Sequence, residues 1–209
     1  MVKFVAFENS QDPDFAAVIN IYQEAFPLSE RIANSWVKQR IDNGDYKLFV
    51  GYQEKLVAFM AILSPITDTQ FVLLAYIATQ ANYRNQGIGS KFLNYILPKL
   101  QQQEKYLLLE VENPQYGDDP QLRERRLNFY RRIGAQQLKN VRFAIPPLAE
   151  NSPVEMLLMI APPYHQKSLS EKIVKKMITW LFVVGYQGSP DSTLLTELLN
   201  EVEEIVELI

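Results

Sequence analysis

Hydrophobic positions along this chain follow two spacings, one typical of amphipathic helices and one typical of buried strands. In the segments 12–26 and 87–103, apolar side chains recur every three or four residues, which predicts a helix in each. Two more helices are predicted, one over 29–41 that Ser29 and Glu30 can start, and a strongly basic one over 121–133. Pro27 follows the first of these segments and Gly134 follows the last, as expected for residues that end helices.

Continuous or alternating apolar runs of strand length lie between the predicted helices. Strands are predicted over residues 3–7, 47–52, 56–63, 71–79, 106–111, 137–145 and 154–160. The run over 71–79 is almost wholly apolar, as expected for a strand that is covered on both faces. Mixed strands and helices in this order predict an α/β fold.

The composition changes after Pro162 and Pro163. Two more helices are predicted there, from Ser168 to Val184 and from Ser192 to Leu208, and each has an apolar face that needs a partner surface. We therefore divide the chain into a domain over 1–163 and a C-terminal helical extension over 164–209. The extension is expected to pack on the core or on a partner subunit. In the second case the chain would form a homodimer.

The chain has 209 residues and 47% hydrophobic content, enough to bury the core of a domain of ordinary size. It contains no cysteine, which excludes disulfides, thiol nucleophiles and cysteine-bound zinc, and its single histidine argues against a histidine-rich metal site. No metal is expected. Carboxylates, tyrosines, backbone amides or water must carry any chemistry.

Charge and hydropathy also limit the partners and the location. The formal net charge is −3 and the pI is about 5.3, so we expect no nucleic acid partner. The N-terminal residues lack the apolar core of a signal peptide, and the longest apolar run, 177–184, is too short to span a bilayer. We expect a cytoplasmic protein with no membrane partner.

Residues 77–90 place a strand end, a loop with two glycines and a helix start in direct succession. The backbone amides of 86–90, with no side-chain bulk at Gly87 and Gly89, can approach a pyrophosphate, and the helix dipole favours its charge. Arg84 adds a positive charge close by. The segment lacks both the third glycine of a dinucleotide fingerprint and the Gly-Lys-Ser/Thr of a P-loop, which makes NAD and ATP poor candidates.

This turn resembles a signature of the GNAT acetyltransferase superfamily, in which Arg or Gln is followed by two residues, Gly, one residue, and Gly or Ala. The match runs from Arg84 through Gly87 to Gly89. A second family signature is similar to the segment Phe129-Tyr130 that leads to Gly134, with Ala135 in place of the usual Phe. The resemblance covers about residues 1–163 and implies a GNAT-like acyl-CoA N-acyltransferase fold.

The resemblance implies that the chain transfers acetyl from acetyl-CoA to a primary amine of a small molecule or peptide by direct attack. Contacts with the coenzyme are expected from both signatures. The expected cofactor-binding residues are Ile77, Ala78, Thr79, Arg84, Asn85, Gln86, Gly87, Ile88, Gly89, Ser90, Arg126 and Phe129. The family often has Asn and Ala where this chain has Arg123 and Arg126, so coenzyme contacts from that helix differ from the usual pattern.

Three residues are the catalytic candidates. The resemblance implies that Tyr130 protonates the leaving thiolate. An alkylamine is mostly protonated near pH 7, so a base is also needed, and Glu110 and Glu112 lie two apart on one strand and face the same side. Burial of Glu110 would raise its pKa toward that task.

Two residues are candidates for acceptor binding. Glu30 lies in a segment that resembles the family's acceptor-binding loop, and Tyr76 projects from the strand over 71–79. Two other functions stay open at this point. The chain could be a non-catalytic acyl-CoA-binding module, or a structural interaction protein in which the glycine turn binds nothing.

Overall fold

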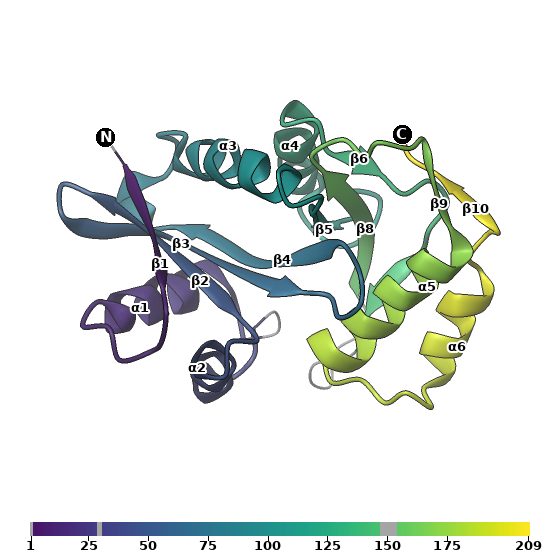
Figure 1. Cartoon of the computed structure of the whole chain (residues 1–209), viewed down its shortest axis with the longest axis horizontal. Helices are drawn as coiled ribbons and strands as arrows, with labels where there is room; N and C mark the ends of the chain where they lie inside the picture. Colours follow the sequence, from purple (N-terminus) through teal and green to yellow (C-terminus); the bar gives the residue numbers. More distant parts are fainter. Residues whose placement is uncertain (1, 29–30, 147–153) are drawn as a thin grey trace. The chain divides into compact units, whose positions relative to one another are not determined.

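The computed structural model describes residues 2–28, 31–146 and 154–209 of the chain (Figure 1). These form two compact units. The first comprises Met1–Pro65 with Val72–Gln103, and the second comprises Ile66–Phe71 with Glu104–Ile209. The mixture of helices and strands confirms the predicted α/β class.

Antiparallel strands form the sheet of the first unit. In spatial order they are β1 (Lys3–Phe7), β2 (Lys47–Gln53), β3 (Leu56–Pro65) and β4 (Phe71–Thr79). Glu54 and Lys55 join β2 to β3, and both have positive φ, at 52° and 67°. Two left-handed residues in succession match the twist of a tight hairpin, so this turn fixes the register of the two strands.

Helices cover both faces of this sheet. Helices α1 (Phe15–Ala25) and α2 (Asn34–Asp42) lie on one face, and α3 (Ile88–Gln101) lies on the other (Figure 1). Neighbouring residues of β3 serve different sides: the ring of Phe59 packs at 5.0 Å from Phe92 of α3, whereas Met60 belongs to the core with Tyr22 of α1. The period-two alternation of side chains along a strand explains this division.

The second unit is built around a pair of antiparallel strands, β5 (Tyr106–Glu112) and β8 (Val154–Ala161). Two short strands, β6 (Gln136–Gln137) and β7 (Phe143–Ile145), also pair with β8. Helix α4 (Pro120–Arg132) packs against β5. Its start is fixed by Asp119, whose Oδ1 accepts a hydrogen bond of 3.1 Å from the Leu122 amide, and by proline at the first helical position.

The C-terminal part completes the second unit. Its elements are β9 (Ser168–Ser170), α5 (Glu171–Trp180), the π-helical turn η2 (Leu181–Gly185), α6 (Thr193–Asn200) and β10 (Ile205–Glu207). Helices α5 and α6 lie side by side, and β9 pairs with β10 (Figure 1). The chain end is tied to the rest of the unit because the Gln137 amide donates to the Ile209 carbonyl at 2.7 Å.

The helix predicted from Ser192 to Leu208 is wrong beyond Asn200. Val206 and Leu208 are buried while Ile205 and Ile209 are each 63% exposed, which is the alternation of a strand. The helix predicted from Ser168 begins at Glu171, because residues 168–170 pair with β10.

Two other predicted elements are shorter than expected. The strand predicted over 137–145 is observed only at its two ends, as β6 and β7. Asn140, which lies between them, has a positive φ of 58°. The helix predicted over 29–41 is observed as Asn34–Asp42, and residues 29–30 lie outside the described part of the chain. Across the described ranges, no helix is both long and apolar enough to cross a bilayer.

Truncation of Leu198 on α6 tests how tightly the C-terminal helices are packed. This side chain is 0% exposed, so Leu198→Ala should lower the free energy of unfolding by about 2–5 kcal/mol through lost burial and a cavity. Urea denaturation followed by circular dichroism measures the change. Ile205→Ala, at a side chain that is 63% exposed, is the control and should change stability by less than about 0.5 kcal/mol. Equal losses in the two variants would contradict the packing described.

Candidate functional site

The turn between β4 and α3 has the backbone shape of an anion site. After β4 the chain makes a 3-10 turn, η1 (Ala81–Tyr83), and then Asn85 and Gly87 both adopt left-handed conformations, with φ of 63° and 72°. Helix α3 starts at Ile88 with no side chain capping its first turn. Its leading amides are therefore available to a ligand, and the helix dipole favours a negative one.

Gly87 borders open space. A Cβ added there would meet no atom within 4 Å, so it is the φ of 72°, and not a close neighbour, that favours glycine at this position. Most of the predicted cofactor-binding residues of this segment are exposed or half-buried, whereas Ala78 and Ile88 are buried, and Ile88 anchors the helix start. The structure thus brings residues 77–79 and 84–90 together in one strand-turn-helix segment.

Arg84 has a carboxylate partner within its own unit. Its Nη2 lies 2.7 Å from Glu24 Oε1, and its Nε donates to the Thr79 carbonyl at 3.1 Å. Glu24 also accepts from the Ala81 amide at 3.0 Å. These bonds tie the turn to α1, so the arginine contributes to the shape of the turn as well as to its charge.

Tyr76 on β4 anchors the chain that follows α1. Its ring packs edge to face on Tyr22 at 4.8 Å, and its hydroxyl accepts from the Ile32 amide at 3.4 Å. Glu30, the other predicted acceptor-binding residue, lies outside the described residues.

Arg31, the next residue in the sequence, has a buried Nη1 with no hydrogen-bond partner among the described residues. Nothing in the sequence around Arg31 distinguished it beforehand.

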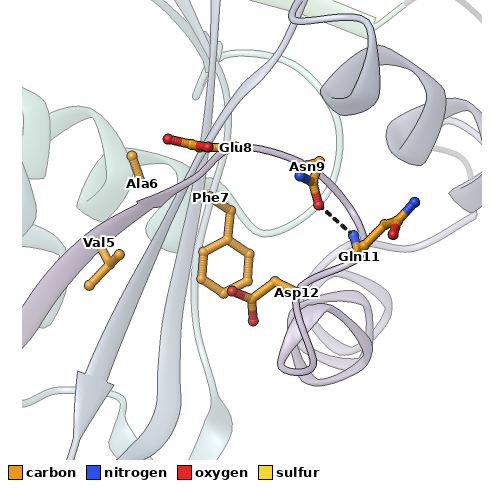
Figure 2. Close-up of a pocket in the computed structure, with 7 residues that line it drawn as sticks. All are labelled: Val5, Ala6, Phe7, Glu8, Asn9, Gln11 and Asp12. Carbon is orange, nitrogen blue, oxygen red and sulfur yellow. Dashed lines mark hydrogen bonds between the residues drawn. The ribbon is translucent and has the colours of Figure 1, made fainter.

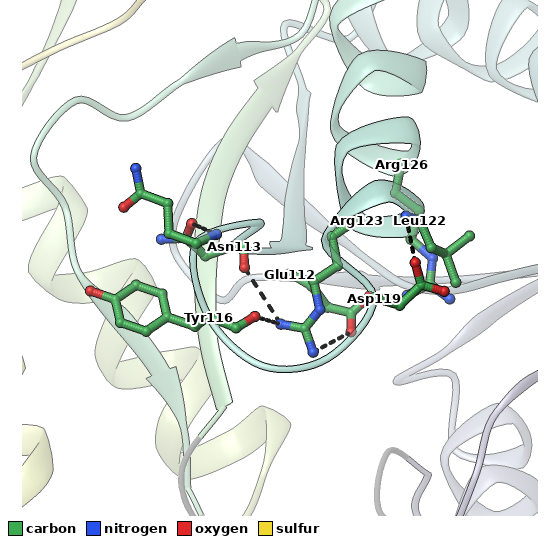
Figure 3. A network of polar contacts seen from close by, with 8 residues as sticks. Glu112, Asn113, Tyr116, Asp119, Leu122, Arg123 and Arg126 are labelled. Atoms are coloured by element: carbon green, nitrogen blue, oxygen red, sulfur yellow. Dashed lines mark hydrogen bonds and ion pairs between the residues drawn. The ribbon is translucent and has the colours of Figure 1, made fainter.

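In the second unit, Glu112 at the end of β5 is held between two arginines of α4 (Figure 3). Arg123 Nη2 lies 3.4 Å from Oε1, and Arg126 Nη1 pairs with Oε2. Arg123 also donates to the carbonyls of Asn113 and Tyr116, which closes the loop between β5 and α4. Arg126, predicted to bind the cofactor, and Glu112, predicted to act in catalysis, are thus each other's partners.

Glu110 has a different environment from Glu112, although both project from the same face of β5. Its Oε1 is shielded from solvent and has no hydrogen-bond partner among the described residues. Burial raises the pKa of this carboxyl to about 8, and a hydrogen bond from Tyr186 partly opposes that rise. The predicted rise in the pKa of Glu110 is confirmed. Tyr186 was missed, because its distance of 76 residues along the chain left no local signal.

Tyr130 lies on α4, directly after Phe129, whose ring packs on it at 5.0 Å. Burial raises the pKa of Tyr130 to about 12, and the positive charge of Arg126 acts in the opposite direction. The hydrogen bonds among the described residues leave its hydroxyl without a partner. A neutral phenol of this kind can donate a proton to a ligand atom within reach.

The candidate residues thus form two groups, one in each unit. The turn over 77–90 and Tyr76 belong to the first unit, and Glu110, Glu112, Arg126, Phe129 and Tyr130 belong to the second. An open hollow of about 410 Å³ lies elsewhere, at the end of β1 (Figure 2). It is lined by residues 5–9, 11 and 12, none of which is a candidate.

Comparisons with known proteins agree on one family. The family model described as acetyltransferase (GNAT) family matches residues 15–135, more than half of the chain. A search among curated proteins returned no match. Solved structures similar to this chain include a protein assigned to the GNAT acetyltransferases from Bacteroides thetaiotaomicron, at 21% identity and a TM-score of 0.74, covering 90% of this chain and 99% of that one.

Two further solved structures support the same fold. The ribosomal-protein-S18-alanine N-acetyltransferase from Escherichia coli is 20% identical with a TM-score of 0.58, over 79% of this chain and 96% of its own. An acetyltransferase described from Salmonella typhimurium with its cofactor acetyl-CoA is 13% identical with a TM-score of 0.54, over 79% and 98%. The family model matches across both the turn over 77–90 and helix α4. This chain therefore belongs to the GNAT family and is an acetyl-CoA-dependent N-acetyltransferase.

Proposed function

We propose that this enzyme transfers acetyl to a primary amine of a small molecule or peptide by direct attack, with Glu110 as the base and Tyr130 as the acid. The observation that carries the proposal is the environment of Glu110. A carboxyl with a shielded, unpartnered oxygen and a pKa of about 8 is suited to accept a proton from an amine near neutral pH.

The proposed reaction has four steps. The Glu110 carboxylate first takes one proton from the ammonium form of the acceptor, which leaves a neutral amine. The nitrogen lone pair then forms a C–N bond to the acetyl carbonyl carbon, the C–S bond of the thioester breaks, and the sulfur leaves with the electron pair. Tyr130 gives its hydroxyl proton to that sulfur. The positively charged nitrogen of the new amide then loses its extra proton, which restores the Tyr130 hydroxyl, and Glu110 releases its own proton to solvent. The chain has no cysteine, so no enzyme thiol can carry the acetyl group, which agrees with direct attack.

The coenzyme is proposed to bind through both signature segments. The turn over 77–79 and 84–90 would hold the pyrophosphate with its amides, and Phe129 and Arg126 would contact the coenzyme from α4. Glu112 would act by fixing Arg126 and the start of α4, the helix that carries Tyr130. We further propose that 1–163 is the acetyltransferase domain and that 164–209 is an extension of it.

The acceptor side is proposed to include Tyr76 and Glu30. Tyr76 contributes an aromatic surface next to Tyr22 and Phe26, with ring centroids at 4.8 and 5.0 Å. A carboxylate at Glu30 would favour a cationic amine. The similar enzyme from Escherichia coli is a ribosomal-protein-S18-alanine N-acetyltransferase, and this supports keeping peptides in the acceptor class.

Replacing Gly87 tests the coenzyme site. Gly87→Trp should weaken acetyl-CoA binding at least about tenfold, because the indole fills the space before the α3 amides and removes charge-assisted hydrogen bonds. Isothermal titration calorimetry measures the change. Gly44→Trp is a matched control, since Gly44 is also left-handed, with φ of 81°, and open. Equal affinity in the two variants would exclude this turn as the pyrophosphate site.

The pH profile tests Glu110. Because the pKa of this carboxyl is raised to about 8, the fraction in the basic form grows as the pH rises through 8. With a primary alkylamine acceptor found in a screen, whose own pKa of about 10 lies above this range, kcat/KM should rise through pH 8. Glu110→Gln should lower kcat by about 10²- to 10⁴-fold and abolish this inflection. Retention of the inflection in the variant would assign the base to another group.

A stability measurement tests whether Glu112, unlike Glu110, stabilises the fold through its ion pairs. Glu112→Gln leaves Arg123 and Arg126 with no carboxylate partner, and the Glu112 side chain is only 17% exposed. The free energy of unfolding should fall by about 1–3 kcal/mol in urea denaturation. The control is Glu124→Gln, because Glu124 and its partner Arg131 are both 50% exposed. This substitution should change the free energy of unfolding by less than about 0.5 kcal/mol. No difference between the variants would show that the network does not stabilise the fold.

A further inference from the structure

Glu110 is anchored by one group within the described residues, the side chain of Tyr186. The other carboxylate oxygen, Oε1, is shielded and unpartnered. A buried carboxylate held by a single hydrogen bond has one oxygen fixed and the other left to meet a ligand. The group that supplies that bond therefore determines which way the second oxygen faces.

Two backbone hydrogen bonds hold the chain at and just after Tyr186. Tyr186 follows η2, and its amide donates to the Leu181 carbonyl at 2.9 Å, five residues back, which is the wide turn of a π-helix. Such turns are rare and frequent at functional sites. Two residues later, the Gly188 amide donates to the Phe182 carbonyl at 2.8 Å. A Cβ on Gly188 would clash with the Phe182 ring and lie 3.0 Å from the Phe182 carbonyl oxygen.

The ring of Tyr186 is also placed by packing. Its centroid lies 6.5 Å from that of Phe143 on β7, a side chain that is fully buried. Backbone and ring are thus both fixed by elements of the second unit, the same unit that contains β5 and Glu110. The hydroxyl is held at the carboxyl by the fold around it.

We infer that Tyr186, supplied by the C-terminal extension, is a positioning residue of the acetyl-transfer site. Its hydroxyl donates to one oxygen of Glu110 and leaves Oε1 facing the acceptor amine. This inference rests on the proposed role of Glu110 as the base. It gives the extension a part in the reaction, beyond covering apolar surface.

The charged groups on the elements packed around Glu110 have partners of their own. Glu112 on β5 is paired with Arg123 and Arg126 of α4, and Glu155 on β8 is paired with Arg142 at 3.0 Å. Tyr130 on α4 is also titratable, and its raised pKa keeps it neutral over the working range. Tyr186 is thus the neighbour whose removal should change the protonation of Glu110 most.

Carbon-13 NMR of the full-length protein, labelled at glutamate side-chain carboxyls, tests this directly without turnover. Glu110→Gln identifies the resonance of Glu110. That resonance should titrate near pH 8 in the native protein and about one pH unit higher in Tyr186→Phe, because the lost hydrogen bond favoured the charged form. The inflection of kcat/KM should move upward by the same amount.

Tyr164→Phe is the matched control. It removes a hydroxyl in the same unit that is bonded to Gln70, so the titration of Glu110 should stay at its native pH. An unchanged Glu110 titration in Tyr186→Phe, or the same shift in both variants, would overturn the inference. Failure of the proposed function gives a different result: the NMR shift would be present while Glu110→Gln retained its activity.

Discussion

Antiparallel pairing of β5 with β8 is the constraint on which the second unit depends. One ladder places Glu110 opposite Leu158 and Glu112 opposite Met156, and thereby fixes the direction of both carboxyls. Helix α4 packs on β5, and β6 and β7 pair with β8. The chain end then joins the segment next to β6 through the bridge between Leu138 and Leu208. A shift of one residue in this ladder would turn both glutamates to the opposite face.

Local patterns predicted the first unit well. The apolar run over 71–79 is β4 with the predicted bounds, and the Gly87 turn leads from it into α3 as the spacing indicated. Such elements depend on contacts between near neighbours in the sequence, and on a glycine that adopts φ of 72°. The apolar run and the position of Gly87 were therefore enough to predict β4 and the start of α3.

The C-terminal part shows where local patterns fail. Apolar residues over 202–208 fit a helical spacing, but the segment becomes β10 because Ser168–Ser170 offers it a partner strand. Pairing between residues far apart in sequence decides the outcome, and one chain gives no sign of it. The bond from Tyr186 to Glu110 is of the same kind. The burial of Glu110, in contrast, followed from its place in an apolar strand.

The arginines of the two signature segments have a consequence for how tightly the coenzyme binds. Arg84 is paired with Glu24, and Arg123 and Arg126 share the single carboxylate of Glu112, on a chain whose net charge is −3. If Arg84 or Arg126 turned to a phosphate of the coenzyme, it would give up a carboxylate partner in exchange. Each of these arginines would then add less to the affinity for the coenzyme than a guanidinium with no ion pair to break.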